Sequence, residues 1–159
     1  TVHAGEAFGA ASIGQALHYC GAHRIGHGTR LREDPDLMRY VNDHRIPLEV
    51  CISSNVQTRT VPEVREHPFH FYFRQGLRVT LNTDSRLISA TSVTNEIAIA
   101  TRAFRLSPYE VKKIVINGFK SAFIPYSEKA RMLRLVTLEV DRIFMEEFPS
   151  EYDRGATGL

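Results

Sequence analysis

Histidine and carboxylate side chains recur along this 159-residue chain, each just after a run of apolar residues. His3 and Glu6 open the chain, His27 stands between two glycines, and Asp84 follows an apolar run at 78–81. Imidazole and carboxylate groups are zinc ligands, and the same groups transfer protons in hydrolysis. A bound zinc ion lowers the pKa of its water to about 7, which makes hydroxide available at neutral pH. These residue types therefore predict a metal-dependent hydrolytic site.

The spacing of the polar clusters indicates the elements that position them. The clusters fall at residues 3–6, 26–28, 53–55 and 82–85. One strand with its returning helix takes about 30 residues, so the clusters follow successive parallel strands and meet at one end of the sheet. Active sites of β/α barrels lie at that end. Any single His or Asp near a strand end is more often a turn residue, and it is the shared spacing that makes the combination specific.

We predict an α/β fold: four β/α units, the second half of a TIM-type (β/α)8 barrel, followed by a helical C-terminal extension. An open four-stranded sheet would leave an edge and an apolar face exposed. Residues 1–88 would carry the half-barrel and the site, residues 89–148 would add helices to the same domain, and residues 149–159 would form a flexible tail. The expected strands end before His3 and span 23–26, 48–52 and 78–81, and the expected helices span 7–22, 34–45, 94–105, 107–122 and 127–148, with one or two short helices in 61–76.

Composition excludes several classes of partner. A hydrophobic content of 43% and a charged content of 24% are typical of globular proteins. The net charge of +2, without a Lys/Arg-rich run, argues against nucleic acid, and no apolar stretch is long enough for a membrane. Cys20 and Cys51 lack paired spacing, so we expect two buried thiols in a reducing compartment, the cytoplasm. Because the chain begins inside a motif at Thr1, we interpret it as a fragment, a processed piece or a subunit that needs a complement.

Four motifs in order resemble the second half of adenosine deaminase, an amidohydrolase-type zinc barrel. The motifs are His3-Ala4-Gly5-Glu6, Arg24-Ile25-Gly26-His27-Gly28, Ser54-Asn55 and Asn82-Thr83-Asp84. The resemblance extends from residue 1 to about residue 125. In that family a zinc-bound water attacks C6 of adenosine, and ammonia leaves to give inosine.

The resemblance implies a role for each matching residue. His3 and Asp84 match zinc ligands, Glu6 matches the acid that protonates purine N1, and His27 matches the histidine that orients and activates the water. We further predict substrate contacts at Gly5, Asn55 and Ser85. Asn55 is equally able to brace its own loop. His67 and His70, in a Pro- and Phe-rich stretch, are assigned to surface or packing roles.

Two departures from the family are visible. No His-any-His motif is present in these 159 residues, although the family uses one for two further zinc ligands, and a catalytic zinc usually has at least three protein ligands. We therefore expect the isolated chain to be inactive without an N-terminal half-barrel. Many members also have a second Asp, which contacts purine N7, where this chain has Ser85 followed by Arg86.

Three alternatives to a two-part adenosine deaminase stay open. The chain could be a non-catalytic binding or assembly module that keeps the fold. It could belong to a deaminase of another aminopurine, such as AMP or adenine. Two copies could also pair into an eight-stranded ring, which would set two His3 and two Asp84 side chains around one axis.

Overall fold

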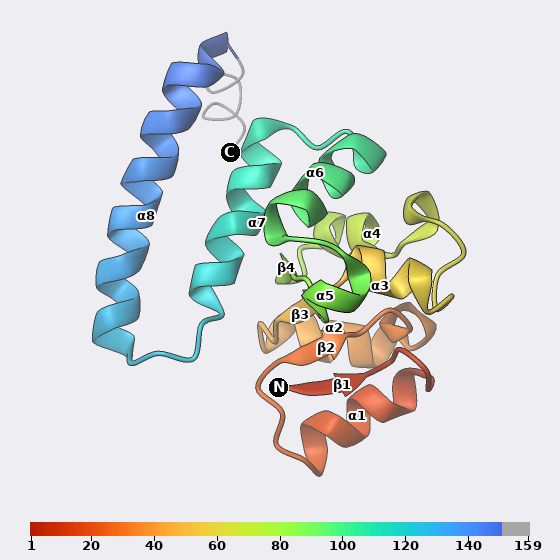
Figure 1. The fold of residues 1–159 in the computed structure, drawn as a ribbon. Helices are drawn as coiled ribbons and strands as arrows, with labels where there is room; N and C mark the ends of the chain where they lie inside the picture. Colours follow the sequence, from red (N-terminus) through yellow and green to blue (C-terminus); the bar gives the residue numbers. More distant parts are fainter. Residues whose placement is uncertain (151–159) are drawn as a thin grey trace. The chain divides into compact units, whose positions relative to one another are not determined.

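The computed structural model describes residues 1–150 and contains one parallel four-stranded sheet (Figure 1). The strands are β1 (Val2–Ala4), β2 (Ile25–His27), β3 (Leu48–Val50) and β4 (Val79–Leu81), in the order β1-β2-β3-β4. Each strand pairs with the next one along the chain, so every crossover moves the same way across the sheet. Right-handed crossovers of this kind place the returning helices on one face. This is the winding of a β/α barrel, and the predicted half-barrel fold is confirmed.

Short helices connect and follow the strands. They are α1 (Ala10–His18), η1 (Leu31–Glu33), α2 (Pro35–Asp43), α3 (Ile52–Gln57), η2 (Val64–Glu66), α4 (Phe69–Arg74), α5 (Arg86–Ser89) and α6 (Val93–Phe104). The start of α2 is as predicted: the Asp34 side chain accepts a hydrogen bond from Leu37 N at 3.0 Å, and Pro35 occupies the first turn. Local signals of this kind need no tertiary contact.

The core of the sheet is formed by apolar strand residues. Ile25, Leu48, Val50 and Val79 are fully buried, in keeping with the Val/Ile/Leu-rich runs of parallel strands. Tyr72 of α4 is also buried, and burial raises the pKa of its hydroxyl to about 12. The protonated hydroxyl lies 3.1 Å from the Gly28 carbonyl and 2.9 Å from the Thr29 carbonyl, and so holds the loop that follows β2.

Several bounds differ from the expectation. β1 includes His3, which we expected after the strand, and β2 is Ile25–His27 instead of 23–26. Helix α1 is Ala10–His18, shorter than the expected 7–22.

The predicted strand at 48–52 was wrong at its end, because β3 stops at Val50 and Ile52 begins α3. The apolar run reads as one buried strand, but Asn55 N donates to the Cys51 carbonyl at 2.9 Å, which closes a helical turn. Periodicity alone cannot distinguish the buried residues of β3 from the apolar start of α3. The short helix α5, directly after Asp84, was also not expected.

The cysteines divide between surface and core. Both are free; Cys51 is buried, whereas Cys20 is exposed, so the expectation of two buried thiols was wrong for Cys20. Cys20 lies beyond the end of α1, in a turn that faces solvent. Burial raises the pKa of the Cys51 thiol to about 12, so it stays protonated and unreactive at neutral pH.

The chain divides into two compact units, Thr1–Phe104 and the residues from Arg105 on. In the second unit α7 (Pro108–Lys120) and α8 (Tyr126–Glu147) run antiparallel (Figure 1) and are linked by an ion pair between Lys112 and Asp141. The predicted capping box of α7 is confirmed by reciprocal bonds between Ser107 and Glu110. Residues 151–159 of the predicted flexible tail lie outside the described residues. Across positions 1–150, no helix has both the length and the apolar character that crossing a membrane requires.

Candidate active site

The predicted chemical residues converge at the carboxyl-end edge of the sheet. His3 lies in β1, His27 is the last residue of β2, and Asp84 follows β4. One possible ligand atom from each lies within 4.8 Å of the others. The two imidazole rings meet edge to face, with centroids 4.6 Å apart and planes at 87°. Parallel strands place their carboxyl ends together, and this brings residues from distant parts of the sequence into one cluster.

Two residues of this cluster have an unusual backbone conformation. His27 has φ 65° and Asp84 has φ 53°, both in the left-handed region. A non-glycine residue held there costs about 1–3 kcal/mol, and such strain concentrates at functional sites. In both cases the left-handed turn comes where the chain leaves a strand, so each side chain is fixed at the sheet edge.

Glu6 reaches the cluster from the turn after β1. Gly5 makes that turn with φ 67°. Both backbone polar groups of Gly5 are already bonded within the chain: its N–H donates to Ser12 Oγ at 2.8 Å, and its carbonyl accepts from Thr29 Oγ1 at 2.6 Å. Gly5 therefore shapes the turn that directs Glu6, and its predicted contact with substrate stays a prediction.

The Glu6 carboxylate lies between two elements of the site. Its Oε2 is 3.4 Å from His27 Nε2, and its Oε1 accepts hydrogen bonds from Asn55 Nδ2 at 3.1 Å and from Thr58 Oγ1 at 3.3 Å. The side chain of Glu6 is 22% exposed, so the carboxylate is held by the protein and still open to a ligand.

Asn55 and Ser54, adjacent on α3, each hold one residue of the cluster. Asn55 is fully buried, and its Nδ2 lies 3.0 Å from His27 Nδ1. Ser54 is also buried and donates to Asp84 Oδ2 at 2.8 Å. Hydrogen bonds of this kind orient ligands and catalytic groups. The predicted substrate contact of Asn55 stays a prediction, but its bonds show that it braces His27 and Glu6.

Two supporting residues were not expected from the sequence. Glu96 of α6 is fully buried, and its carboxylate accepts from Ser53 N at 3.1 Å and from Thr91 Oγ1 at 2.7 Å, which fixes the first turn of α3. His67, assigned to the surface or to packing, is 3% exposed and its Nε2 lies 3.1 Å from Asn55 Oδ1. Neither spacing nor periodicity marks these residues, because their partners are remote in sequence or become near neighbours only on folding.

Burial sets the electrostatics of His27. Desolvation lowers the pKa of its imidazole, against opposing contributions from Glu6 and Asp84, which favour the charged form. Burial also lowers the pKa of His67 to about 3, assisted by the nearby Arg32 guanidinium. Both imidazoles are therefore neutral at pH 7, which leaves the choice of protonated nitrogen to their hydrogen bonds.

The cluster fits a zinc ion by its donor set. Two imidazoles and a carboxylate are ligands that zinc takes, at about 2.0–2.2 Å each. Two atoms that bind the same zinc ion are thus about 4 Å apart or less. The candidate ligand atoms of His3, His27 and Asp84 lie within 4.8 Å of one another, so small side-chain movements would bring them to this distance. The arrangement suits His3 and Asp84 as ligands with His27 next to the ion.

Ser85 lies beside the cluster at the start of α5. It is exposed and occupies the N-cap position without a side-chain capping bond. Its hydroxyl is therefore presented to solvent next to Asp84. This position is compatible with the predicted substrate contact, which stays a prediction.

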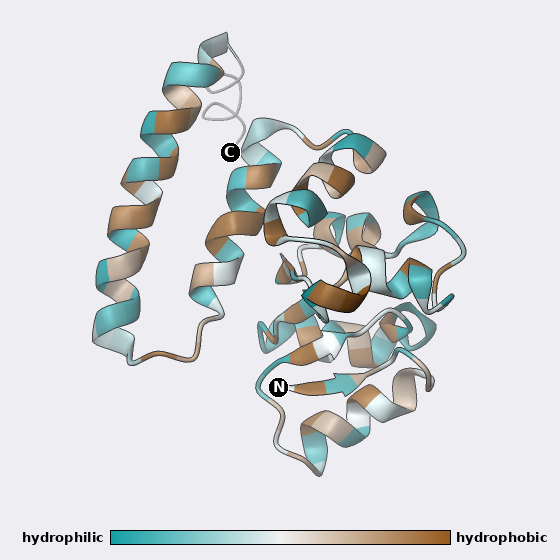
Figure 2. Cartoon of the chain, viewed as in Figure 1, coloured by the Kyte–Doolittle hydropathy of each residue, from teal (hydrophilic) through white to brown (hydrophobic). Residues whose placement is uncertain are grey.

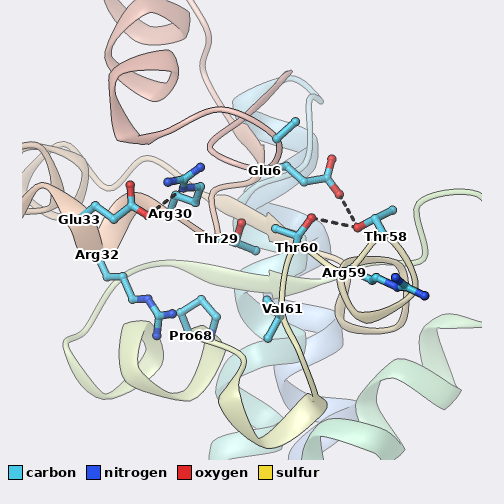
Figure 3. A pocket seen from close by; sticks show the side chains of 11 residues that line it. Glu6, Thr29, Arg30, Arg32, Glu33, Thr58, Arg59, Thr60, Val61 and Pro68 are labelled. Carbon is cyan, nitrogen blue, oxygen red and sulfur yellow. Dashed lines mark hydrogen bonds and ion pairs between the residues drawn. The ribbon is translucent and has the colours of Figure 1, made fainter.

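A cavity of about 640 Å³ opens on another side of Glu6. Figure 3 shows Glu6 directed toward Thr58, which in turn bonds Thr60. The lining residues are Glu6, Ala7, Thr29, Arg30, Arg32, Glu33, Thr58, Arg59, Thr60, Val61 and Pro68. His3, His27 and Asp84 are not among them, so this cavity borders the cluster at Glu6 alone.

Comparisons with known proteins agree with this geometry. The sequence profile of adenosine deaminase matches residues 1–138. An adenosine deaminase of Mycobacterium sp. (strain KMS) is 44% identical over 144 residues, which cover 84% of this chain and 40% of that relative. The chain therefore spans about 40% of the length of the curated relatives it matches.

Two solved structures are similar in fold and sequence. An adenine deaminase from Arthrobacter aurescens superposes with a TM-score of 0.83 at 31% identity, over 87% of this chain and 43% of that one. The N6-methyl-AMP deaminase of Arabidopsis thaliana superposes with a TM-score of 0.73 at 28% identity, over 92% of this chain and 40% of that one.

Proposed function

The chain belongs to the adenosine deaminase family, and we propose on that basis that it is the C-terminal part of a zinc-dependent hydrolase. The reaction is adenosine plus water giving inosine plus ammonia. The observation that carries this proposal is the meeting of Glu6, His27 and Asp84 with His3 at one edge of the sheet. Hydrolytic deamination needs a group that transfers protons and a metal that activates water. A carboxyl group beside an imidazole, next to a set of metal-ligand side chains, can supply both.

Each residue has a task set by its position. Zinc, when bound, supplies a water of lowered pKa. His3 and Asp84 would hold the ion, and Ser54 orients Asp84 through its 2.8 Å bond. Glu6 would take one proton of the water and give it to ring nitrogen N1 as the water oxygen bonds to C6. The second proton of the water would go to the amino group, and the bond from C6 to that nitrogen would break as ammonia leaves. His27, whose Nε2 lies 3.4 Å from Glu6 Oε2, would orient the same water.

A complementary N-terminal half completes the site in this proposal. Two further zinc ligands must come from it, because no His-any-His motif is present in these 159 residues. Exposed apolar side chains favour such a partner: on α5, Leu87 is 97% exposed and Ile88 is 84% exposed. Figure 2 shows α5 as a hydrophobic segment at the surface. Beside Asp84, this segment is suited to pack against the remaining part of the barrel.

The substrate is the least constrained part of the proposal. We favour adenosine because the family profile and the 44%-identical relatives are adenosine deaminases. Adenine and AMP-type purines are the alternative, since the similar solved structures are an adenine deaminase and an N6-methyl-AMP deaminase. The Ser85 side chain reaches less far than an aspartate and would make a weaker hydrogen bond to the purine, so it does not select among these substrates.

Reconstitution tests the proposal. The chain is co-expressed with the N-terminal part of the Mycobacterium relative that it does not cover, and the complex is loaded with zinc. The ultraviolet change from adenosine to inosine is followed, with adenine and AMP in parallel. We expect turnover of one of these purines, lost in Glu6→Gln and on zinc removal, and kept in Glu63→Ala, an exposed carboxylate of the same unit.

Each other outcome identifies an alternative. A folded complex with stoichiometric zinc and no purine turnover would overturn the deaminase proposal, and one that also binds no zinc would favour a binding or assembly module. The solution mass of the isolated chain tests whether two copies pair into an eight-stranded ring. A monomer would exclude that pairing. A cytoplasmic location stays a prediction, which the two free cysteines favour.

A further inference from the structure

A buried chain of hydrogen bonds leads from the backbone to His27. Phe69 N donates to His67 Nδ1 at 3.0 Å. His67 Nε2 lies 3.1 Å from Asn55 Oδ1, and Asn55 Nδ2 lies 3.0 Å from His27 Nδ1. The side chains of His67, Asn55 and His27 are 3%, 0% and 1% exposed, so water does not compete for these bonds.

The backbone N–H of Phe69 sets the donor-to-acceptor direction of this series of hydrogen bonds. A backbone N–H can only donate, so His67 Nδ1 must accept and carries no proton. Because burial lowers the pKa of His67 to about 3, its imidazole is neutral at pH 7 and has its single proton on Nε2. That Nε2–H must then meet an acceptor, and the amide oxygen of Asn55 is the acceptor in reach.

The orientation of the Asn55 amide then determines which nitrogen of His27 accepts a hydrogen bond. With its oxygen bonded to His67, its nitrogen faces the active site and has two hydrogens to donate. One goes to His27 Nδ1 and the other to Glu6 Oε1 at 3.1 Å. His27 Nδ1 is therefore an acceptor, and the neutral imidazole has its proton on Nε2, the nitrogen 3.4 Å from Glu6 Oε2.

We propose that His67 and Asn55 are positioning residues that hold His27 in the tautomer with the proton on Nε2, so that His27 presents a hydrogen-bond donor to the reacting groups. A donor at this point orients and stabilises an oxygen that gains negative charge, and it does not remove a proton. The effect on catalysis rests on the proposed deaminase function, whereas the tautomer depends only on the bonds described.

Nitrogen-15 NMR of the 159-residue chain, labelled at histidine, tests the tautomer directly. We expect His27 to show a protonated Nε2 and an unprotonated Nδ1. Asn55→Asp keeps the size of the side chain but replaces the amide donor by a carboxylate, which can only accept. Its expected effect is to move the His27 proton from Nε2 to Nδ1. His67→Phe removes the donor and should give a mixture of tautomers, and His67→Gln, which can again accept from Phe69 N and donate to Asn55, should restore the single form.

The control is His70→Gln, three residues from His67 and outside the hydrogen-bond chain, which should leave the His27 spectrum unchanged. A proton on His27 Nδ1 in the unaltered chain would overturn the inference. So would a folded Asn55→Asp protein with the original tautomer. If Asn55→Asp does not fold, the unaltered chain and the pair of His67 variants still decide the matter.

Kinetics in the reconstituted complex separate this inference from the function on which its catalytic part rests. Asn55→Asp should lower kcat about 100-fold and leave KM within about twofold, and His67→Gln should recover most of the activity that His67→Phe loses. If no purine turns over while NMR gives the expected tautomer, the deaminase proposal fails and the positioning role stands. If purine turns over while His27 has its proton on Nδ1, the positioning role fails and the deaminase proposal stands.

Discussion

Gly26 of β2 lies directly against the imidazole ring of His3 in β1. The two residues are partners in the sheet register, and a Cβ placed on Gly26 would stand 2.5 Å from His3 Cδ2. The missing side chain is thus the space that the His3 ring occupies, next to Asp84 and His27.

Gly26→Ala should therefore displace the His3 ring. Zinc sites depend on ligand positions held to about 0.5 Å, so we expect the affinity of the reconstituted complex for zinc to fall at least about 10-fold. Titration with a competing chelator measures this. Gly118→Ala on α7, where an added Cβ meets nothing within 4 Å, is the matched control. Unchanged zinc affinity in Gly26→Ala would show that His3 is not a ligand.

Ser54→Ala should weaken the metal site through Asp84. The substitution removes the 2.8 Å bond that orients the Asp84 carboxylate, and loss of such a bond typically lowers metal affinity about 10–100-fold. The same chelator titration measures it in the reconstituted complex. Ser53→Ala, in which the backbone N–H bonded to Glu96 is retained, should bind zinc as the unaltered chain does.

Glu96→Ala should destabilise the first unit. It leaves Ser53 N and Thr91 Oγ1 without their acceptor, and unsatisfied groups of this kind cost about 1–3 kcal/mol each. Urea unfolding should show a loss of about 2–6 kcal/mol, with a smaller loss in Glu96→Gln, which keeps one acceptor oxygen. The exposed Glu63→Ala should change stability by less than about 0.5 kcal/mol. Equal stability of Glu96→Ala and Glu63→Ala would contradict the bracing role.

Acid should destabilise the protein through His67. Its pKa is about 3 when folded and 6.5 when unfolded, so between these values only the unfolded chain binds the proton. Stability then falls as the pH drops, by about 1.4 kcal/mol per unit, which is about 2 kcal/mol from pH 6.5 to 5.0. The lowered pKa of His27 acts in the same direction.

His67→Gln removes one of these two contributions. Its free energy of unfolding should fall less steeply from pH 6.5 to 5.0 than that of the unaltered chain, whereas from pH 7 to 8 the His67 contribution is constant. Urea unfolding across this pH range measures both slopes. Identical slopes below pH 6.5 would mean that His67 is not buried as a neutral group.

Much of the fold could be predicted from local signals. The alternation of apolar runs and helical segments gives a parallel sheet, because such connections need right-handed crossovers. The starts of α2 and α7 could be located because Asp34 and Ser107 cap their own helices. The beginning of α3 could not, because it depends on the carboxylate of Glu96, 43 residues away from Ser53.

The amino-acid sequence by itself determined which chemical groups follow the strands and at what interval, and so that His3, Glu6, His27 and Asp84 would reach one edge of a parallel sheet. Only the tertiary structure decided how those groups are held. His67 and Glu96 become supports of the site when folding buries them against Asn55 and Ser53. The physical reason is that hydrogen bonds between groups buried from water arise from packing, which no spacing along the chain encodes.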